Sequence, residues 1–429
     1  MNNRILFILI AILGVAIFMS SCSDRGAAVD PNDYTRGPGP YTQEHEFDDQ
    51  LGFCMFSYIR DERLVSYLMY APPDYAGINE GAPYPVLFLL APYGETEEFY
   101  FNHGLQDVAD RLIDSGEIVP MLILCIDGSN GYGGCFYGDS WAGGRYAQLI
   151  GDVESDPPTG TMIDWIDNIY NTISDSRFGG GTGRANRAIS GVGMGGYGAM
   201  RIAIEYSENF SAVSAVSAPL DFDGATGNGG FVPLFDQVIA NLETPYAEMD
   251  TSYNDPLRNM FFAAATSFSP HDTGYDGRKF YPKDESIYGE QLLDWHADDT
   301  FRIEDLNTYF EPNGATAPIK FHLPFDENGD PYTPIWDLWL RENCESKLAD
   351  HPGALDATDV LLYTTPDAPY NFHQQTLDFS SYLTSQGIDH EMRTYTGYSD
   401  YSATGNRYYY DIMAEILKYH SDRFSLLED

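Results

Sequence analysis

The sequence predicts an α/β fold in which a mostly parallel central sheet carries helices on both faces. Three observations predict this class. Short apolar runs alternate with stretches of helical periodicity from residue 64 onward, as in chains built from successive strand and helix units. The 429 residues are 43% hydrophobic, which is ample for a packed core. A strand, a turn dense in glycine and a helix also follow one another at residues 187–206.

The strands and helices follow from two different apolar patterns. Short runs of apolar residues predict strands at 64–70, 85–90, 121–126, 187–190, 212–216, 360–363 and 391–395. Apolar residues three or four positions apart predict helices at 105–113, 162–173, 194–206, 372–383 and 409–417. The interval 222–357 breaks this alternation and is too long for an ordinary loop. We therefore expect an insertion whose short helices pack over one end of the sheet.

The N-terminus has the pattern of an export signal. Arg4 precedes an unbroken apolar run of 15 residues, which is shorter than the roughly 20 residues that a membrane-spanning helix needs. The run ends in Met-Ser-Ser-Cys22, which resembles a bacterial lipobox. That resemblance implies a signal peptide at 1–21, lipid attachment at Cys22, a flexible tether at 22–46, and a folded domain at 47–429 in the bacterial cell envelope, facing the periplasm or the cell surface. A plain secretory signal and an uncleaved membrane anchor are the alternatives.

The net charge excludes one class of partner. With 23 Lys and Arg against 65 Asp and Glu, the formal charge is −42. A surface this acidic repels the phosphate backbone, so nucleic acid is excluded as a general partner.

Four cysteines remain once Cys22 is set aside. Cys125 and Cys135 flank a glycine-rich turn, and either a disulfide between them or buried free thiols fit the sequence. Cys54 and Cys344 are the other two, and the connectivity of the four does not follow from the sequence. No CxxC pair or His/Cys cluster with zinc-ligand spacing occurs, so we expect no metal and no cofactor.

The most informative motif is the glycine-dense turn. Residues 187–200 read RAISGVGMGGYGAM, a strand that enters a tight turn and leaves as a helix. This is the setting of the nucleophile elbow G-x-S-x-G. Gly191 and Gly195 occupy the two outer positions of that pattern. The middle position, where a serine would stand, is Gly193.

These residues resemble the esterase D family of α/β hydrolases. The family's elbow reads like RAI-G-SMGGYGA, and residues 187–199 match it at nearly every place except the serine. The first buried strand of the family looks like YPVLYLLHG, compared with YPVLFLLAPYG at 84–94. The resemblance covers roughly residues 47–424. It implies the α/β-hydrolase fold, with the long insertion after the strand that follows the elbow helix, and carboxylic-ester hydrolysis or acyl transfer as the family activity.

The same resemblance places the catalytic positions. The nucleophile falls on Gly193, the acid on Asp367, and the histidine on Ser399, so two of the three triad members are replaced. The backbone N–H groups of Tyr93 and Met194 fall on the oxyanion-hole positions. Ala91 and Pro92 stand where the family has His-Gly, and Pro92 is expected to reshape that loop.

A few other residues are candidates to replace the missing nucleophile and base. Ser190 ends the predicted strand, so its hydroxyl is expected within the sheet packing. His373 begins the helix after Asp367 and is placed to lie near the cleft, and His271 belongs to a Ser-Pro-His-Asp turn at 269–272. A surface or packing role is favoured for both. Three tryptophans of the insertion fit either its small core, which is favoured, or stacking on a sugar or aryl group: Trp295, Trp336 and Trp339.

The sequence therefore predicts an exported lipoprotein whose esterase-like domain is catalytically impaired. Such a domain keeps its cleft for a small-molecule ligand, a glycan or another ester-like compound. The alternative is an active ester hydrolase or acyltransferase that uses a non-standard nucleophile. A purely structural or partner-binding role is a third reading.

Overall fold

A computed structural model describes the chain over most of the predicted domain. The described residues are 53–58, 64–73, 84–129, 133–140, 144–152, 162–163, 183–224, 229–240, 256–270, 321–326, 328–395 and 406–424. The predicted signal peptide, Cys22 and the tether lie outside them. So do Ser399, His271, Trp295 and most of the predicted helix at 162–173.

The centre of the fold is an eight-stranded sheet with the order β1-β2-β4-β3-β7-β8-β9-β10. The strands, in chain order, are β1 Phe53–Tyr58, β2 Leu64–Tyr70, β3 Val86–Leu90, β4 Leu122–Ile126, β7 Arg187–Val192, β8 Ala212–Val216, β9 Asp359–Thr364 and β10 Glu391–Thr394. β1 pairs with β2 and β2 with β4 in antiparallel fashion, and every other neighbouring pair is parallel. The predicted α/β class with a mostly parallel sheet is confirmed.

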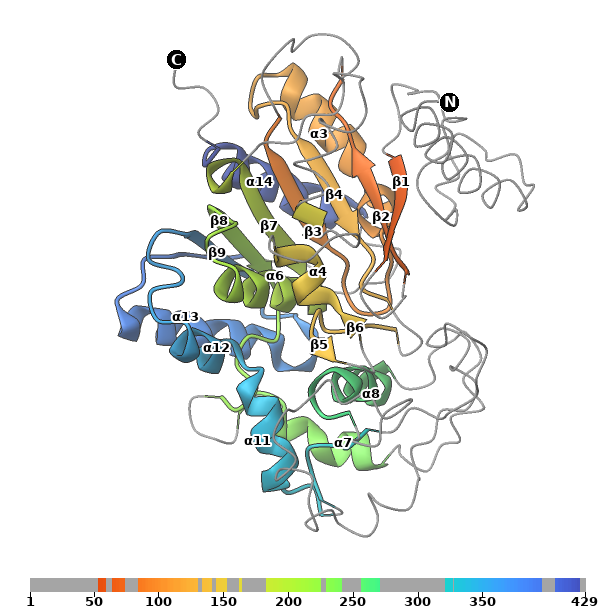
Figure 1. The fold of residues 1–429 in the computed structure, drawn as a ribbon, viewed down its shortest axis with the longest axis vertical. Coiled ribbons are helices and arrows are strands. Elements are labelled where there is room, and N and C mark those ends of the chain that lie inside the picture. The colour runs from red at the N-terminus through yellow and green to blue at the C-terminus, as the bar shows by residue number, and fades with distance from the viewer. Residues whose placement is uncertain are drawn as a thin grey trace, which may run out of the picture.

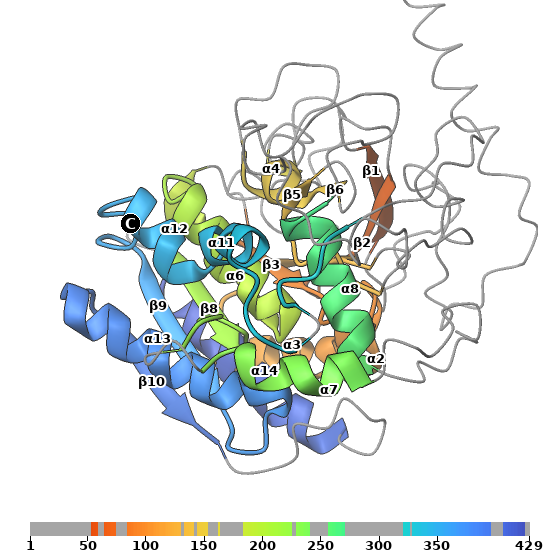
Figure 2. The ribbon, with the colours of Figure 1, turned by 90° about the horizontal axis from the view of Figure 1, so that it is seen from below.

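Helices cover both faces of this sheet. One face packs against α3 (Leu105–Asp114) and α14 (Asn406–Ser421), which lie together in Figure 1. The opposite face packs against α4 (Tyr146–Gly151), α6 (Met194–Glu205) and α13 (Phe372–Gln386). Strand side chains alternate between these two cores: Ile189 of β7 belongs to the α6 side, whereas its neighbour Ala188 belongs to the α3 side. Figure 2 shows the edge strands β1 and β10 on opposite sides of the molecule.

The predicted insertion contributes a group of helices at one end of the molecule. They are η2 (Val232–Leu234), α7 (Phe235–Ala240), α8 (Pro256–Phe268), α11 (Thr333–Arg341) and α12 (Cys344–Asp350). Figure 1 shows α7, α8 and α11 together, away from α3 and α14. Ser140 Oγ donates to the Thr266 carbonyl of α8 at 2.6 Å, so α8 covers the segment that follows β4.

Buried ion pairs attach the insertion to the helix after the glycine turn. The Arg201 guanidinium of α6 lies 3.0 Å from the Glu342 carboxylate, and Lys347 Nζ of α12 lies 2.7 Å from Glu205. The side chains of these four residues are at most 14% exposed. Tyr197 also donates its hydroxyl to the Glu342 carbonyl at 2.7 Å. Removing one member of these buried ion pairs would leave an unpaired buried charge, which destabilises the folded state. We therefore expect α6 and α12 to stay packed together as one unit.

Short elements fill the remaining connections. They are α2 (Phe99–Asn102), β5 (Asp139–Ser140), β6 (Gly144–Arg145), η1 (Arg184–Asn186) and η6 (Pro369–Asn371).

No helix within the described segments is long and apolar enough to cross a membrane.

Three cysteines of the domain do not form disulfides. Cys125, Cys135 and Cys344 are free and buried. Of the two alternatives for Cys125 and Cys135, the structure therefore has the free thiols. Burial raises the thiol pKa of all three, which keeps them protonated and unreactive at neutral pH.

Candidate active site

The glycine turn sits at the carboxyl end of β7. Gly193 forms its apex with φ 56° and ψ −118°, and α6 begins at the next residue. Its N–H donates to the Val216 carbonyl at 2.8 Å, which ties the apex to the end of β8. A backbone with positive φ favours glycine, and the side chain at the apex is a single hydrogen. The apex therefore offers no nucleophilic atom.

Close packing explains a second glycine of the motif. A Cβ added to Gly195 would lie 2.0 Å from the Leu90 carbonyl oxygen, so only glycine lets α6 approach β3 this closely. The turn thus keeps the backbone shape of a nucleophile elbow without the nucleophile.

The two predicted oxyanion-hole residues meet beside this apex. Met194 is the first residue of α6, where backbone N–H groups have no partner within the helix. Tyr93 lies in the turn after β3, which is held by a bond from the Gly94 N–H to the Gly133 carbonyl at 2.8 Å. A Cβ on Gly134 would lie 2.4 Å from Met194 Sδ and 2.9 Å from Tyr93 Cδ2. The side chains of Tyr93 and Met194 therefore converge on one point.

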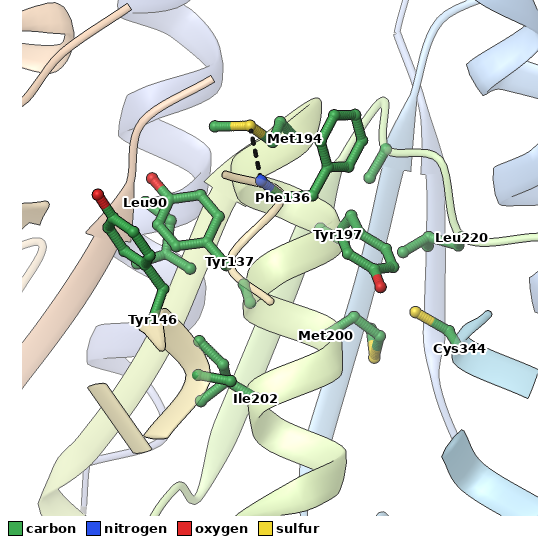
Figure 3. Close-up of a cluster of buried hydrophobic side chains, with 14 of the residues drawn as sticks. Leu90, Phe136, Tyr137, Tyr146, Met194, Tyr197, Met200, Ile202, Leu220 and Cys344 are labelled. Atoms are coloured by element: carbon green, nitrogen blue, oxygen red, sulfur yellow. Dashed lines mark hydrogen bonds between the residues drawn. The ribbon is translucent and has the colours of Figure 1, made fainter. Parts of the chain in front are cut away.

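One side of the apex is apolar and closed. Figure 3 shows Met194 reaching Phe136, whose N–H donates to Met194 Sδ at 3.3 Å. The Phe136 ring packs edge-on against Phe268 of α8 at 5.5 Å between centroids. Phe136 and Tyr137 both have positive φ, 47° and 45°, and neither side chain is exposed. Apolar side chains and a strained backbone turn fill this side.

The other side of the apex carries hydroxyl groups. Ser217, the residue after β8, has φ 44° and lies 2.9 Å through its Oγ from the Tyr395 hydroxyl. Tyr395 follows β10 and is half-buried. Burial is the main cause that raises the pKa of Tyr395, with Tyr363 and Asp367 adding to it and the Ser217 hydrogen bond opposing it. Tyr395 therefore stays protonated at neutral pH. The sequence analysis missed this pair.

Asp367 lies on this polar side. It follows β9, its side chain is exposed, and its N–H donates to Thr365 Oγ1 at 3.3 Å. Its charge is the smallest of the causes that raise the pKa of Tyr395. His373, the histidine expected near the cleft, has Nδ1 3.4 Å from Thr364 Oγ1 at the end of β9.

A second serine cluster lies beneath the sheet surface. Ser214 Oγ donates to Ser190 Oγ at 2.6 Å and lies 2.8 Å from His420 Nε2 of α14. All three residues are at most 2% exposed. Ser190 is inside the packing, as predicted, although β7 continues two residues beyond it to Val192. Burial, and then the charge of Arg423, lowers the pKa of His420 to about 3.

The described tryptophans of the insertion belong to its core. Trp336 and Trp339 are 5% and 0% exposed. Trp339 stacks on Phe261 with 5.6 Å between centroids and donates Nε1–H to Ser269 Oγ at 2.9 Å. Neither ring is available to stack on a sugar.

Within the described segments, no group of three or more His, Cys, Asp or Glu side chains could hold a metal ion.

Comparison with known proteins identifies the family. The family model described as "Putative esterase" matches residues 62–299, which include β2, the Tyr93 turn and the whole glycine elbow. The chain belongs to this esterase family. Esterases from two strains of Mycobacterium tuberculosis are 26% identical to it over 222 residues, which is 46% of this chain and 42% of each relative. The chain thus spans less than half the length of these curated relatives.

Solved structures of similar proteins include two hydrolases. An S-formylglutathione hydrolase from Agrobacterium tumefaciens aligns with a TM-score of 0.47 at 14% identity, over 89% of this chain and 98% of that one. A ferulic acid esterase aligns with a TM-score of 0.46 at 14% identity, over 86% of this chain and 98% of that one.

Proposed function

We propose that this esterase-family protein is catalytically impaired and uses its elbow region to bind a neutral ester-like or glycan ligand. The observation that carries the proposal is Gly193 at the apex of the elbow. Acyl transfer needs an oxygen or sulfur nucleophile next to a base. Without it, only the residual catalysis of binding and the oxyanion hole remains, on the order of 10³ to 10⁴ over water in hydrolases that have lost their triad.

Two features support retained binding. The side chains of Tyr93 and Met194 approach each other beside the elbow, and the resemblance assigns the backbone N–H groups of these two residues to an oxyanion hole, which suits a carbonyl oxygen. The polar side of the apex carries the half-buried Tyr395, whose hydroxyl is hydrogen-bonded to the buried Ser217, and hydroxyl groups bind neutral oxygen atoms. The formal charge of −42 disfavours anionic ligands.

The alternative is an active hydrolase with a displaced nucleophile. Ser217 is the described serine that best fits it, because it follows a parallel strand with positive φ beside the elbow. Its hydroxyl partner, Tyr395, has a raised pKa and therefore does not accept a proton as a base would. The impaired enzyme is thus the better supported reading.

Hydrolysis and labelling assays separate the two. We expect the purified protein to hydrolyse p-nitrophenyl acetate no more than a few times faster than buffer, and a serine-directed fluorophosphonate to leave its intact mass unchanged. Saturable turnover that disappears when the phosphonate adds to one peptide would contradict impairment. Mapping that peptide would show whether Ser217 or another residue is the nucleophile.

We further propose that the chain is a lipoprotein of the bacterial cell envelope. The support is the apolar run that ends at Cys22. The substitution Cys22→Ser is expected to release the protein from membranes or to stall its processing. Unchanged partitioning into detergent would mean that the apolar run itself is the anchor.

A further inference from the structure

The segment at residues 135–140 joins the elbow to the insertion. On the elbow side, the Phe136 N–H donates to Met194 Sδ at 3.3 Å. On the insertion side, Ser140 Oγ donates to the Thr266 carbonyl of α8 at 2.6 Å. Figure 1 shows β5, which ends this segment, between α4 and α8. A change in the packing of the segment would therefore affect both the start of α6 and the insertion.

Asp139 of β5 lies beside a network of buried charges. Two cations and two carboxylates alternate in this network, and each cation lies within 3.1 Å of both carboxylates: Arg201, Lys347, Glu205 and Glu342. The four charges balance one another. Asp139 adds a third carboxylate, and the charges of Arg201, Glu205 and Lys347 all act on it. When Asp139 is ionised, the five groups together carry one negative charge in excess.

The backbone next to Asp139 approaches the network closely. A Cβ added to Gly138 would lie 2.9 Å from Arg201 Nη1. That nitrogen is buried and has no hydrogen-bond partner among the described residues. The half-buried Asp139 side chain instead accepts the Gln148 N–H of α4 at its Oδ1, at 3.1 Å. Asp139 therefore joins β5 to α4 while it lies in the field of the network.

Three further titratable side chains face Asp139 from other elements. Arg145 stands opposite Asp139 in the register of β5 and β6, and its Nη1 donates to Gln148 Oε1 at 3.3 Å. Asp152, after α4, accepts from Gln148 Nε2 at 3.2 Å. Burial, and then the charge of Asp139, raises the pKa of the Tyr206 hydroxyl. Arg145, the cation of these three, thus bonds to a neutral amide, and Tyr206 stays uncharged.

The surroundings of Asp139 favour its neutral form. Burial raises the pKa of its carboxyl from the ordinary 3.8 to about 6, while the charge of Arg201 opposes this rise and the charge of Glu205 adds to it. The packed segment therefore holds the proton more tightly than an opened segment does. The stability gained in this way is present in acid and is lost as the pH rises from about 4 to about 6.

We propose that Asp139 makes the junction between the elbow and the insertion sensitive to pH, so that residues 135–140 and α4 pack more tightly in mild acid than at neutral pH. Asp139 acts through the charge balance of the network and contacts no ligand. The inference goes beyond the proposed function and holds whatever the elbow binds.

Hydrogen exchange of the full-length protein tests this at two amides. The Tyr146 N–H donates to the Gly138 carbonyl and the Gln148 N–H to Asp139, so both report opening of the junction. With the intrinsic pH dependence of exchange divided out, their protection should be about tenfold higher at pH 5 than at pH 7.5, because the carboxyl pKa is about 6 in the packed segment and 3.8 in the opened one.

Two variants and one titration decide the outcome. Asp139→Asn keeps an acceptor for the Gln148 N–H but does not ionise, so its protection should be equal at the two pH values. Asp152→Asn removes a carboxylate from the end of α4 and should keep the tenfold difference. A difference that persists in Asp139→Asn would overturn the inference. In the wild-type protein, the carboxyl carbon-13 shift of Asp139 should titrate near pH 6, and a midpoint near 4 would overturn it without any variant.

Discussion

Two serine clusters lie close to the elbow. The cluster that contains a histidine is the buried one, and the cluster without a histidine lies at the ends of the strands. Ser190, Ser214 and His420 contain both a hydroxyl and an imidazole in one hydrogen-bonded chain, the ingredients of a nucleophile and its base. Ser217 and Tyr395 contain no histidine. Yet the first cluster is sealed between the sheet and α14, whereas the second stands at the carboxyl ends of the strands.

Burial decides the difference. A His420 pKa of about 3 means that the imidazole does not take up a proton at neutral pH, and no substrate reaches a residue that is fully buried. Tyr395 keeps part of its surface and a protonated hydroxyl, which suits binding rather than proton abstraction. We conclude that the inner cluster contributes to stability, and propose that the outer one contributes to recognition.

The largest expected effect comes from placing a serine and a histidine at the two positions that the family resemblance assigns to the nucleophile and its base. The double substitution Gly193→Ser and Ser399→His should raise ester hydrolysis about a hundredfold above either single variant, because a serine and its base act as one unit. The measurement is the rate with p-nitrophenyl acetate in all four proteins. The serine at φ 56° should also lower stability, by about 1–3 kcal/mol.

Two outcomes would change the comparison of the clusters. A folded double variant without activity would mean that Phe136 and Met194 close the acyl pocket. Substantial activity in Gly193→Ser alone would mean that a base is already present, with His373 the first residue to test.

The second largest effect concerns the inner cluster and acid. The unfolded chain binds a proton at His420 below its ordinary pKa of 6.5, whereas the folded protein does so only near 3, so stability falls as the pH drops from about 6.5 toward 3. At about 1.4 kcal/mol per pH unit, the loss between pH 6.5 and 5 is about 2 kcal/mol. Urea unfolding at several pH values should show this slope.

The contribution of His420 to this slope should be absent from one variant and persist in its control. His420→Gln removes the buried imidazole, while His351→Gln changes an exposed one. Carboxyl groups with raised pKa values oppose the slope, among them Asp139 at about 6 and Glu345 at about 7, but they are common to all three proteins and cancel in the difference. Equal slopes in the wild type and His420→Gln would mean that His420 does not contribute to the pH dependence of stability.

The sequence predicted the frame of the molecule well, since apolar periodicity reports which face of an element is buried. The strand at 212–216 and the start of α6 at Met194 agree with the structure residue by residue. β1 at Phe53–Tyr58 was missed, and β7 runs two residues further than predicted because Gly191 and Val192 still pair with β8. A glycine in the sequence signals a turn but does not say where pairing stops.

The candidate site was only half predictable. The motif placed Gly193 at the turn and Met194 at the start of the helix, as the structure has them, because a local pattern encodes backbone shape. The pair of Ser217 and Tyr395 joins residues 178 positions apart on strands that are not neighbours, since β9 lies between them. No periodicity or spacing reports such a contact, and the state of Cys125 and Cys135 stayed open for the same reason.

The smallest expected effect is also the one that separates the two clusters most directly. Ser214→Ala leaves the Ser190 hydroxyl and His420 Nε2 buried without their shared partner, and should cost about 1–2 kcal/mol of unfolding free energy. Ser217→Gly at the outer edge should cost less, because glycine relieves the positive φ and Tyr395 reaches water. Ser217→Gly should weaken the binding of an acetylated methyl glucoside, a neutral ester, whereas Ser214→Ala should bind it as the wild type does. Equal losses of stability in the two variants, or a loss of affinity in Ser214→Ala, would contradict this division of roles. The two clusters would then both affect stability and ligand binding.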